Sequence, residues 1–176
     1  MTVILLPGQR PAGRRGFEIV LSSAETGGAA ALVEGRVPAA MAGPPLHIHP
    51  ASDESYFVLS GALLMYVDGE VTELAEGGLA HISRGTQHTW ATPPRSGAHF
   101  LMLHVPGGYE EYHPTALRAE QQLGGPLTPA DLFDLAQRFD WELAGPEPLR
   151  LLPTGTLVEA SRADAEASRI DPAARQ

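Results

Sequence analysis

The chain has 176 residues, enough for one domain with a buried core, and its 43% hydrophobic and 19% charged content is typical of a globular protein. Its 21 acidic and 12 basic residues give a net charge of −9, which argues against a nucleic-acid partner, because phosphate binding needs clustered positive charge. The absence of cysteine excludes disulfides, thiolate metal sites and a thiol nucleophile.

Membrane attachment and secretion are not expected. No apolar run approaches the roughly 20 residues that a membrane-spanning helix needs. The opening residues lack the basic start and long apolar stretch of a secretion signal. We therefore expect a cytoplasmic protein without a membrane partner.

Short β-prone runs, separated by glycine and proline, fill the first 107 residues, which predicts an all-β fold. An extended entry at Pro44-Pro45 leads into a strand that carries His47. An Asp68-Gly69 pair between two runs predicts a tight hairpin, because both positions need positive φ. The other predicted strands cover residues 17–21, 29–37, 54–59, 62–67, 71–74, 79–82, 88–92 and 99–105.

Beyond Gly107 the pattern becomes helical. Thr128, Pro129 and Asp131 form a helix start, with Thr128 as the N-cap. Apolar residues from Leu132 to Phe139 then recur at helical spacing. We expect one amphipathic helix that ends before Gly145 and packs on the outside of the β core, with a dimer contact as the less favoured use of its apolar stripe.

Three histidines and a glutamate are spaced as ligands of a metal ion. His47 and His49 leave the same face of a strand, Glu54 follows closely, and His88 lies across a hairpin and a turn. Nitrogen and oxygen donors suit one divalent transition-metal ion, and iron, nickel, manganese, zinc, cobalt and copper all remain open. Asp53 competes with Glu54 but should point the other way. The alternative is a barrel without metal, which is disfavoured because burying these groups unpaired is costly.

Strand alternation predicts the wall of a pocket beside this site. If Glu54 and His88 face inward, Tyr56, Val58 and Trp90 do as well. Met65 or Tyr66 should add to the lining, with one of two alternate sets, Phe100-Met102-His104 or His99-Leu101-Leu103. The residues chosen for the pocket are Tyr56, Val58, Met65, Trp90, Met102 and His104.

Other polar residues are expected to serve the surface or to lie near the site. We place four histidines there: His81, His99, His104 and His113. Glu110 and Glu111 fit a solvated helix start, and Asp140 fits a solvated face together with Asp131 and Asp134.

The ligand spacing resembles the two sequence motifs of the cupin superfamily. The first motif reads HxH, four residues, Glu, six residues, Gly, and it is matched by His47, His49, Glu54 and Gly61. The second reads Gly, five residues, PxG, two residues, His, three residues, Asn. It is matched at Gly77, Gly85 and His88, with Ser83 and Thr92 in place of the proline and the asparagine.

This resemblance implies a double-stranded β-helix, the cupin jelly-roll barrel, with a C-terminal α-helical extension. The barrel with its N-terminal strands is expected over residues 1–110. A helical extension packed on it follows over 111–153, and a loosely held tail or surface helix over 154–176. The resemblance also implies a homodimer.

Within the cupins, the chain is similar to single-domain bacterial quercetinases, which are flavonol dioxygenases, over residues 44–50, 53–61 and 106–112. This implies a metal-dependent dioxygenase acting on an enolic or aromatic small molecule, in which Glu54 is also the catalytic base. Two alternatives stay open, because one fold hosts many activities. They are a metal-dependent isomerase, cyclase or lyase that does not use O2, and a non-catalytic small-molecule-binding cupin.

Overall fold

One long strand, β4 (Asp53–Val67), runs through both halves of the β structure in this computed structural model, which describes residues 2–4, 6, 10, 16–145 and 148–159. Its first half pairs with β6 and β8, and its second half pairs with β5 and β7. The register shifts between Val58 and Ser60, and Gly61 follows with a φ of +76°. Such a bulge bends a strand, and it lets β4 pass from one half to the other. The sequence predicts two runs with a bend at Gly61, and the structure joins them into one bent strand.

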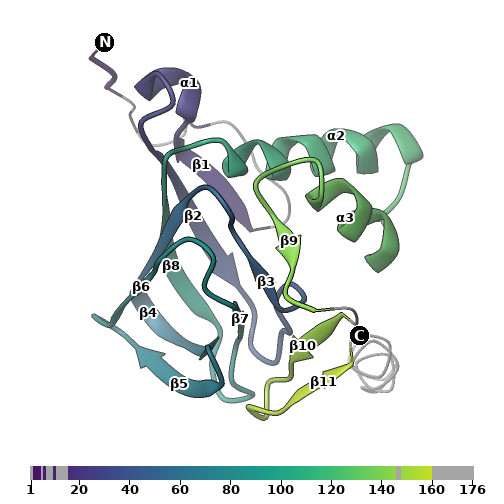
Figure 1. Cartoon of the computed structure of the whole chain (residues 1–176). Helices are drawn as coiled ribbons and strands as arrows, with labels where there is room; N and C mark the ends of the chain where they lie inside the picture. Colours follow the sequence, from purple (N-terminus) through teal and green to yellow (C-terminus); the bar gives the residue numbers. More distant parts are fainter. Residues whose placement is uncertain (1, 5, 7–9, 11–15, 146–147, 160–176) are drawn as a thin grey trace, which may run out of the picture.

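Within the described residues, nine strands form one hydrogen-bonded sheet in the order β1-β2-β8-β4-β7-β3-β9, with β5 and β6 also paired to β4 (Figure 1). All the pairings are antiparallel. The strand bounds besides β4 are β1 (Phe17–Leu21), β2 (Ala31–Val37), β3 (His47–Ile48), β5 (Glu70–Ala75), β6 (Leu79–Ile82), β7 (His88–Ala91), β8 (Ala98–Val105) and β9 (Glu142–Leu143). The all-β prediction is confirmed.

The predicted hairpin joins β4 to β5. Val67 pairs with Glu70, which leaves Asp68 and Gly69 as a two-residue loop with φ values of +44° and +99°. Positive φ at both positions is what a type I′ turn requires, and its twist matches that of the flanking strands.

The core lies between the two halves of the sheet and centres on Phe100, which is fully buried. Its ring contacts those of Phe17, Tyr56 and Trp90, with centroids 6.2, 5.8 and 5.8 Å away. Gly35 on β2 makes room for it, because a Cβ there would lie 2.5 Å from the Phe100 ring.

Thr92 stands where the second cupin motif has asparagine. It is fully buried, and its hydroxyl donates to the Pro38 carbonyl at 2.7 Å and accepts from the Met41 amide at 2.9 Å. The threonine thus ties the end of β7 to the loop that leads toward β3.

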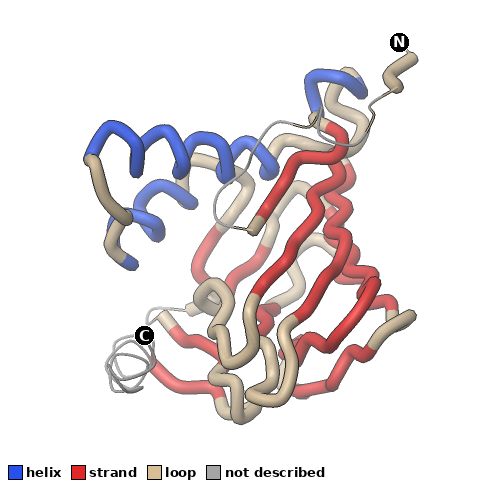
Figure 2. The backbone as a smooth tube through the Cα atoms, turned by 180° about the vertical axis from the view of Figure 1, so that it is seen from behind, coloured by secondary structure: helices blue, strands red, loops and turns tan. Residues whose placement is uncertain are grey.

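The chain after the barrel contains more helix than its sequence pattern predicts. A 3-10 turn, η1 (Tyr109–Glu111), leads into α2 (Tyr112–Leu123), and α3 (Pro129–Ala136) follows. The expectation of a single helix was therefore wrong, although the predicted capping box of Thr128 and Asp131 starts α3. Figure 2 shows these helices gathered on one side of the strands. Another short helix, α1 (Ser23–Thr26), joins β1 to β2.

A small hairpin, β10 (Leu149–Leu151) with β11 (Leu157–Glu159), ends the described part. The region expected to be a tail therefore begins with ordered strand, and residues 160–176 of that expectation lie outside the described residues. No described helix has the length and apolar character needed to cross a membrane.

Candidate metal centre

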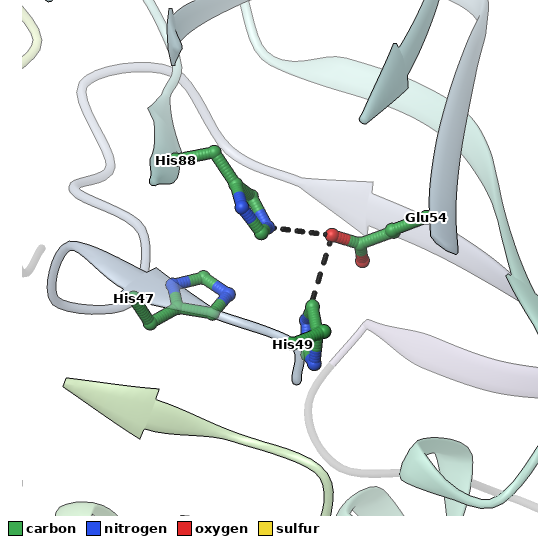
Figure 3. Close-up of side chains that lie close together, drawn as sticks. All are labelled: His47, His49, Glu54 and His88. Carbon is green, nitrogen blue, oxygen red and sulfur yellow. Dashed lines mark hydrogen bonds and ion pairs between the residues drawn. The ribbon is translucent and has the colours of Figure 1, made fainter. Parts of the chain in front are cut away.

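The structure brings His47, His49, Glu54 and His88 together inside the barrel (Figure 3). His47 on β3 is paired directly with His88 at the start of β7, and Glu54 projects from β4. One ligand atom from each residue lies within 4.8 Å of all the others. Each side chain is at most 2% exposed, so the four converge in a buried site.

Backbone carbonyls orient the three imidazoles. The Nδ1 of His47 donates to the Pro45 carbonyl at 2.8 Å, and that of His88 donates to Thr86 at 2.9 Å. The Nδ1 of His49 donates to the carbonyl of Asp140. We assign the tautomers from these bonds: a proton on Nδ1 leaves Nε2 of each ring as the donor to a metal ion.

The Glu54 carboxylate meets the histidines through both oxygens. Its Oε2 lies 2.8 Å from His88 Nε2 and 3.6 Å from His49 Nε2, and dashed lines mark both contacts in Figure 3. Its Oε1 lies 3.3 Å from Nε2 of His104. Burial alone would raise the pKa of Glu54, but His104, the hydrogen bond from His88 and the charge of His49 outweigh it and hold the pKa well below its usual value. Glu54 is therefore an anion.

The pKa values of His47 and His88 are shifted in opposite directions. Burial, followed by the neighbouring His88 and His49, lowers the pKa of His47 well below its usual value, so this ring stays neutral with its lone pair available. Burial would also lower the pKa of His88, but the hydrogen bond and charge of Glu54 outweigh it and raise that pKa.

These residues fit a transition-metal ion. Nε2 of His49 is buried and has no hydrogen-bond partner among the described residues. A buried polar atom without a partner is costly, and a metal ion would satisfy it. Three imidazole nitrogens and a carboxylate are also a donor set that first-row metals accept. The four residues could therefore hold a metal ion, of any of the six elements named above.

Asp53 faces away from this centre, as expected. It accepts hydrogen bonds from Arg84 at 2.9 to 3.1 Å, and those bonds lower its pKa to about 2.

A cavity of about 270 Å³ reaches His47 and Glu54 from outside the barrel. Aromatic rings dominate its wall, and both tryptophans of the chain belong to it. Its aromatic lining residues are Phe17, Tyr56, Trp90, Tyr109, Tyr112, Phe133 and Trp141. Burial, together with the Glu54 charge, raises the pKa of Tyr56 well above its usual value, so this phenol keeps its proton and can donate a hydrogen bond.

Three of the six residues predicted for the pocket line this cavity, namely Tyr56, Trp90 and Met102. Val58 and Met65 pack into the hydrophobic core instead, at 0% and 2% exposure. His104 is fully buried beside Glu54 and is not part of the cavity wall.

The sequence reasoning did not find the part of the wall that comes from beyond the barrel. Tyr109 and Tyr112 belong to the turn and helix after β8, and Phe133 and Trp141 come from α3 and the loop after it. His113, expected at the surface or near the site, is 6% exposed and also lines the cavity. The aromatic cluster at residues 109–113 and a tryptophan after a predicted helix are the signals that could have indicated this wall.

Two acidic residues expected in solvent have structural partners. Glu110 is fully buried and accepts from the amides of Ser23 and Gly108, each at 2.6 Å. Asp140 accepts from Ala51 and Ser52 next to the metal centre. Both side chains satisfy backbone or hydroxyl donors that would otherwise lack a partner, which is why they face inward.

Comparison with known proteins agrees with this fold. Residues 35–104 match the family model described as a cupin domain. The polyketide cyclase RemF from Streptomyces resistomycificus has a similar fold, with a TM-score of 0.51 at 20% identity over 60% of this chain and 80% of that one. An RmlC-like cupin from Shewanella frigidimarina gives a TM-score of 0.50 at 15% identity, over 60% of this chain and 93% of that one. No curated protein matches the sequence. Residues 35–104 therefore match a cupin domain, and the β structure that carries the metal centre has the cupin fold.

Proposed function

We propose that this cupin is a metal-dependent dioxygenase that acts on an enolic or aromatic small molecule, as the quercetinases it resembles do. The observation that carries the proposal is that Glu54 belongs both to the metal centre and to the wall of an aromatic cavity. A molecule in the cavity can therefore meet the base and the metal donors at the same point.

The cavity wall supports the choice of substrate class. Most of the lining side chains are aromatic or apolar, and the charged or imidazole side chains among them are His47, Glu54, His113 and Arg150. Such a wall binds a planar apolar body, while a few placed polar groups fix its orientation. A hydroxylated aromatic or polyketide-like molecule, with its hydroxyl toward Glu54, fits this arrangement.

The residues divide the chemistry between them. Glu54 is an anion held by histidines, and it can take the proton of an acidic enol or phenol in the cavity. Tyr56 keeps its proton and can donate a hydrogen bond to an oxygen of the substrate. A bound metal ion would supply Lewis-acid stabilisation of the deprotonated substrate and a place where substrate and O2 meet.

One observation favours a second candidate, a proton-transfer reaction that does not use O2. Tyr56 and Glu54 lie two residues apart on β4 and both line the cavity, so a hydroxyl and a carboxylate face the same space, an arrangement that an isomerase, cyclase or lyase can use. The polyketide cyclase RemF shares the fold.

Oxygen consumption tests the proposal. The protein is loaded in turn with Fe²⁺, Ni²⁺, Mn²⁺, Co²⁺, Zn²⁺ and Cu²⁺, and quercetin and related hydroxyflavones are offered as probes. We expect oxygen uptake that matches flavonol loss with at least one metal, and its absence in Glu54→Gln. The matched control Glu70→Gln changes an exposed residue of β5 and should retain activity.

Binding is measured separately from turnover. Because Trp90 and Trp141 both line the cavity, quenching of their fluorescence reports occupancy directly. Undiminished substrate loss without O2 would overturn the dioxygenase and support the second candidate. Binding without turnover under any metal would overturn both and indicate a non-catalytic binding cupin.

A further inference from the structure

The segment after α3 returns to the barrel beside the strand that carries the ligands. In β9, Leu143 pairs with His47 and Glu142 with Ile48, and Figure 1 shows β9 next to β3. The Ala144 amide also donates to the Leu46 carbonyl at 3.1 Å. Residues 140–144 therefore form an edge strap on the metal-ligand strand.

Residues 49–52, which lie between β3 and β4, form what we call the ligand loop. Asp140, the first residue of the strap, contacts three residues of this loop. Its carbonyl accepts from His49 Nδ1. Its carboxylate accepts from the Ala51 amide at 2.8 Å and from the Ser52 hydroxyl at 2.5 Å. These contacts fix the ring of His49 and also the backbone between His49 and Glu54, so one residue orients the path that joins two of the four ligands.

Trp141, the next residue, contacts a third ligand. Its ring stacks on that of His47, with centroids 5.3 Å apart and planes 22° apart, and only 2% of the residue is exposed. Trp141 also lines the cavity, and its ring contacts Phe133 of α3 at 5.5 Å. The strap thus joins the metal centre to the wall that α3 contributes.

The other carboxylates of this region have no such contacts. Asp131 caps the start of α3 through Thr128, and Asp134 lies exposed on the same helix. Asp140 therefore differs from its neighbours in touching the ligand loop, and Asp134 offers a matched control of equal charge.

We propose that Asp140 is a positioning residue for the metal centre, and that through it metal binding and closure of the strap stabilise each other. The inference rests on the metal centre of the proposed function but not on its reaction. The physical reason is linkage: if the closed strap raises metal affinity by some factor, the metal favours the closed strap by the same factor.

Titration with Co²⁺, whose absorbance reports coordination, tests the first half of the proposal. Asp140→Ala should weaken Co²⁺ binding by about ten- to hundredfold, the usual effect of removing a group that supports a metal ligand. The Co²⁺ affinity of Asp140→Asn should lie between those of Asp140→Ala and the unaltered protein, because its amide oxygen can still accept a hydrogen bond from the Ala51 amide. Asp134→Ala should bind as the unaltered protein does.

A double-mutant cycle identifies the contact. Ser52→Ala removes the donor on the other side of the 2.5 Å bond and should weaken binding less than Asp140→Ala. The double variant should match Asp140→Ala within about twofold, because the two changes remove one shared contact. Additive losses would overturn the assignment to this bond.

The absorbance spectrum at saturating Co²⁺ separates positioning from general stability. Asp140→Ala should shift the spectrum, because His49 sits in a relaxed loop, whereas a purely stabilising residue would leave the spectrum of the fully loaded protein unchanged. Unchanged affinity and spectrum in Asp140→Ala would overturn the proposal.

Hydrogen exchange tests the second half. Co²⁺ should slow exchange of the amides of residues 141–144 in the unaltered protein and in Asp134→Ala, and much less in Asp140→Ala. Equal exchange with and without bound Co²⁺ would overturn the coupling. If none of the six metal ions binds the unaltered protein, the metal centre itself fails, which is a different result from metal binding that Asp140→Ala leaves intact.

Discussion

The two carboxylate oxygens of Glu54 have different neighbours. Oε2 faces His88 and His49 across the metal centre, whereas Oε1 lies 3.3 Å from Nε2 of His104. The ring of His104 also packs against those of His49 and Tyr109, at 5.4 and 5.1 Å. His104 thus contacts the carboxylate oxygen that His49 and His88 do not contact, and its nitrogens are not among the four converging ligand atoms.

Metal binding should distinguish His88, one of the four candidate ligands, from His104, which contacts the Glu54 carboxylate but is not one of the four. His88→Ala should lower metal affinity by more than the about ten- to hundredfold that follows loss of a residue supporting a ligand, and His104→Ala should stay within that range. The exposed His81, changed to alanine, is the control. Elemental analysis after purification without chelators gives the metal bound per chain. Equal loss in His88→Ala and His104→Ala would contradict the distinction.

The spacing of His47, His49, Glu54 and His88 was enough to predict that these residues gather, because period-two strands and a tight hairpin fix where each one points. The partner of His49 could not be predicted in this way. Asp140 lies 91 residues further along the chain, and the contact uses its backbone carbonyl, which has no sequence signature. Alternation also misplaced Val58 and Met65, because a strand that faces the interior can face either the cavity or the core.

Helix α3 supplies part of the cavity wall, and a capping box fixes its start. Thr128 Oγ1 accepts from the Asp131 amide at 3.2 Å, and the Asp131 carboxylate accepts from the Thr128 amide at 3.0 Å. Leu132, Phe133 and Ala136 of this helix face the cavity. The cap therefore helps to hold the wall in place.

Removing the cap should destabilise the protein modestly. Thr128→Ala is expected to lower the free energy of unfolding by about 1 kcal/mol, because the Asp131 amide at the helix start loses the hydroxyl that accepts its hydrogen bond. Thr128→Ser retains the hydroxyl and should be close to the unaltered protein. Urea denaturation of the three proteins measures the difference. Equal stability of Thr128→Ala would show that the cap contributes nothing in this setting.

Helix α2 was predicted only as a helix start at Glu110 and Glu111, and its extent, greater than that of α3, was not predicted. Its buried face consists of His113, Ala116 and Glu120, which lie at helical spacing but are small or polar. A hydrophobic pattern cannot mark such a face. The strands were easier to predict, because alternation and turn residues such as Asp68-Gly69 coincide at their ends.

A charge cluster around the buried Glu34 joins three distant parts of the chain. Glu34 on β2 is 6% exposed, and its carboxylate accepts from His99 on β8 at 2.6 Å. It also pairs with Arg36 at 2.5 Å and with Arg10. Burial alone would raise the pKa of Glu34, but the bond from His99 and the charges of Arg36 and Arg10 outweigh it and lower that pKa.

Stability should depend on pH through this carboxyl. Because its pKa is lower in the folded protein, its contribution is present above the ordinary glutamate value of 4.5 and is lost as pH falls through the folded pKa. Glu34→Gln should therefore be less stable than the unaltered protein at pH 7, and the gap should narrow below pH 4.5. Urea denaturation across this range measures the gap, with the exposed Glu70→Gln as control. A gap that does not change with pH would contradict the assignment.

At the level of the whole chain, the barrel could be predicted and its closure by the later segment could not. The two cupin motifs lie within the 70-residue span 35–104 that the cupin family model matches, and local spacing defines them. Closure depends on β9 pairing with β3 and on Trp141 stacking on His47, contacts between residues about 95 positions apart. Two residues of strand carry too little pattern to indicate a partner at that distance.

Anomalous diffraction from crystals of the metal-loaded protein, recorded on both sides of the absorption edge of the metal, tests the metal centre most directly. We expect one anomalous peak per chain, bounded by Nε2 of His47, His49 and His88 and by the carboxylate of Glu54. A peak elsewhere, or no peak at these four residues in protein shown to contain the metal, would contradict the centre and the chemistry proposed for it.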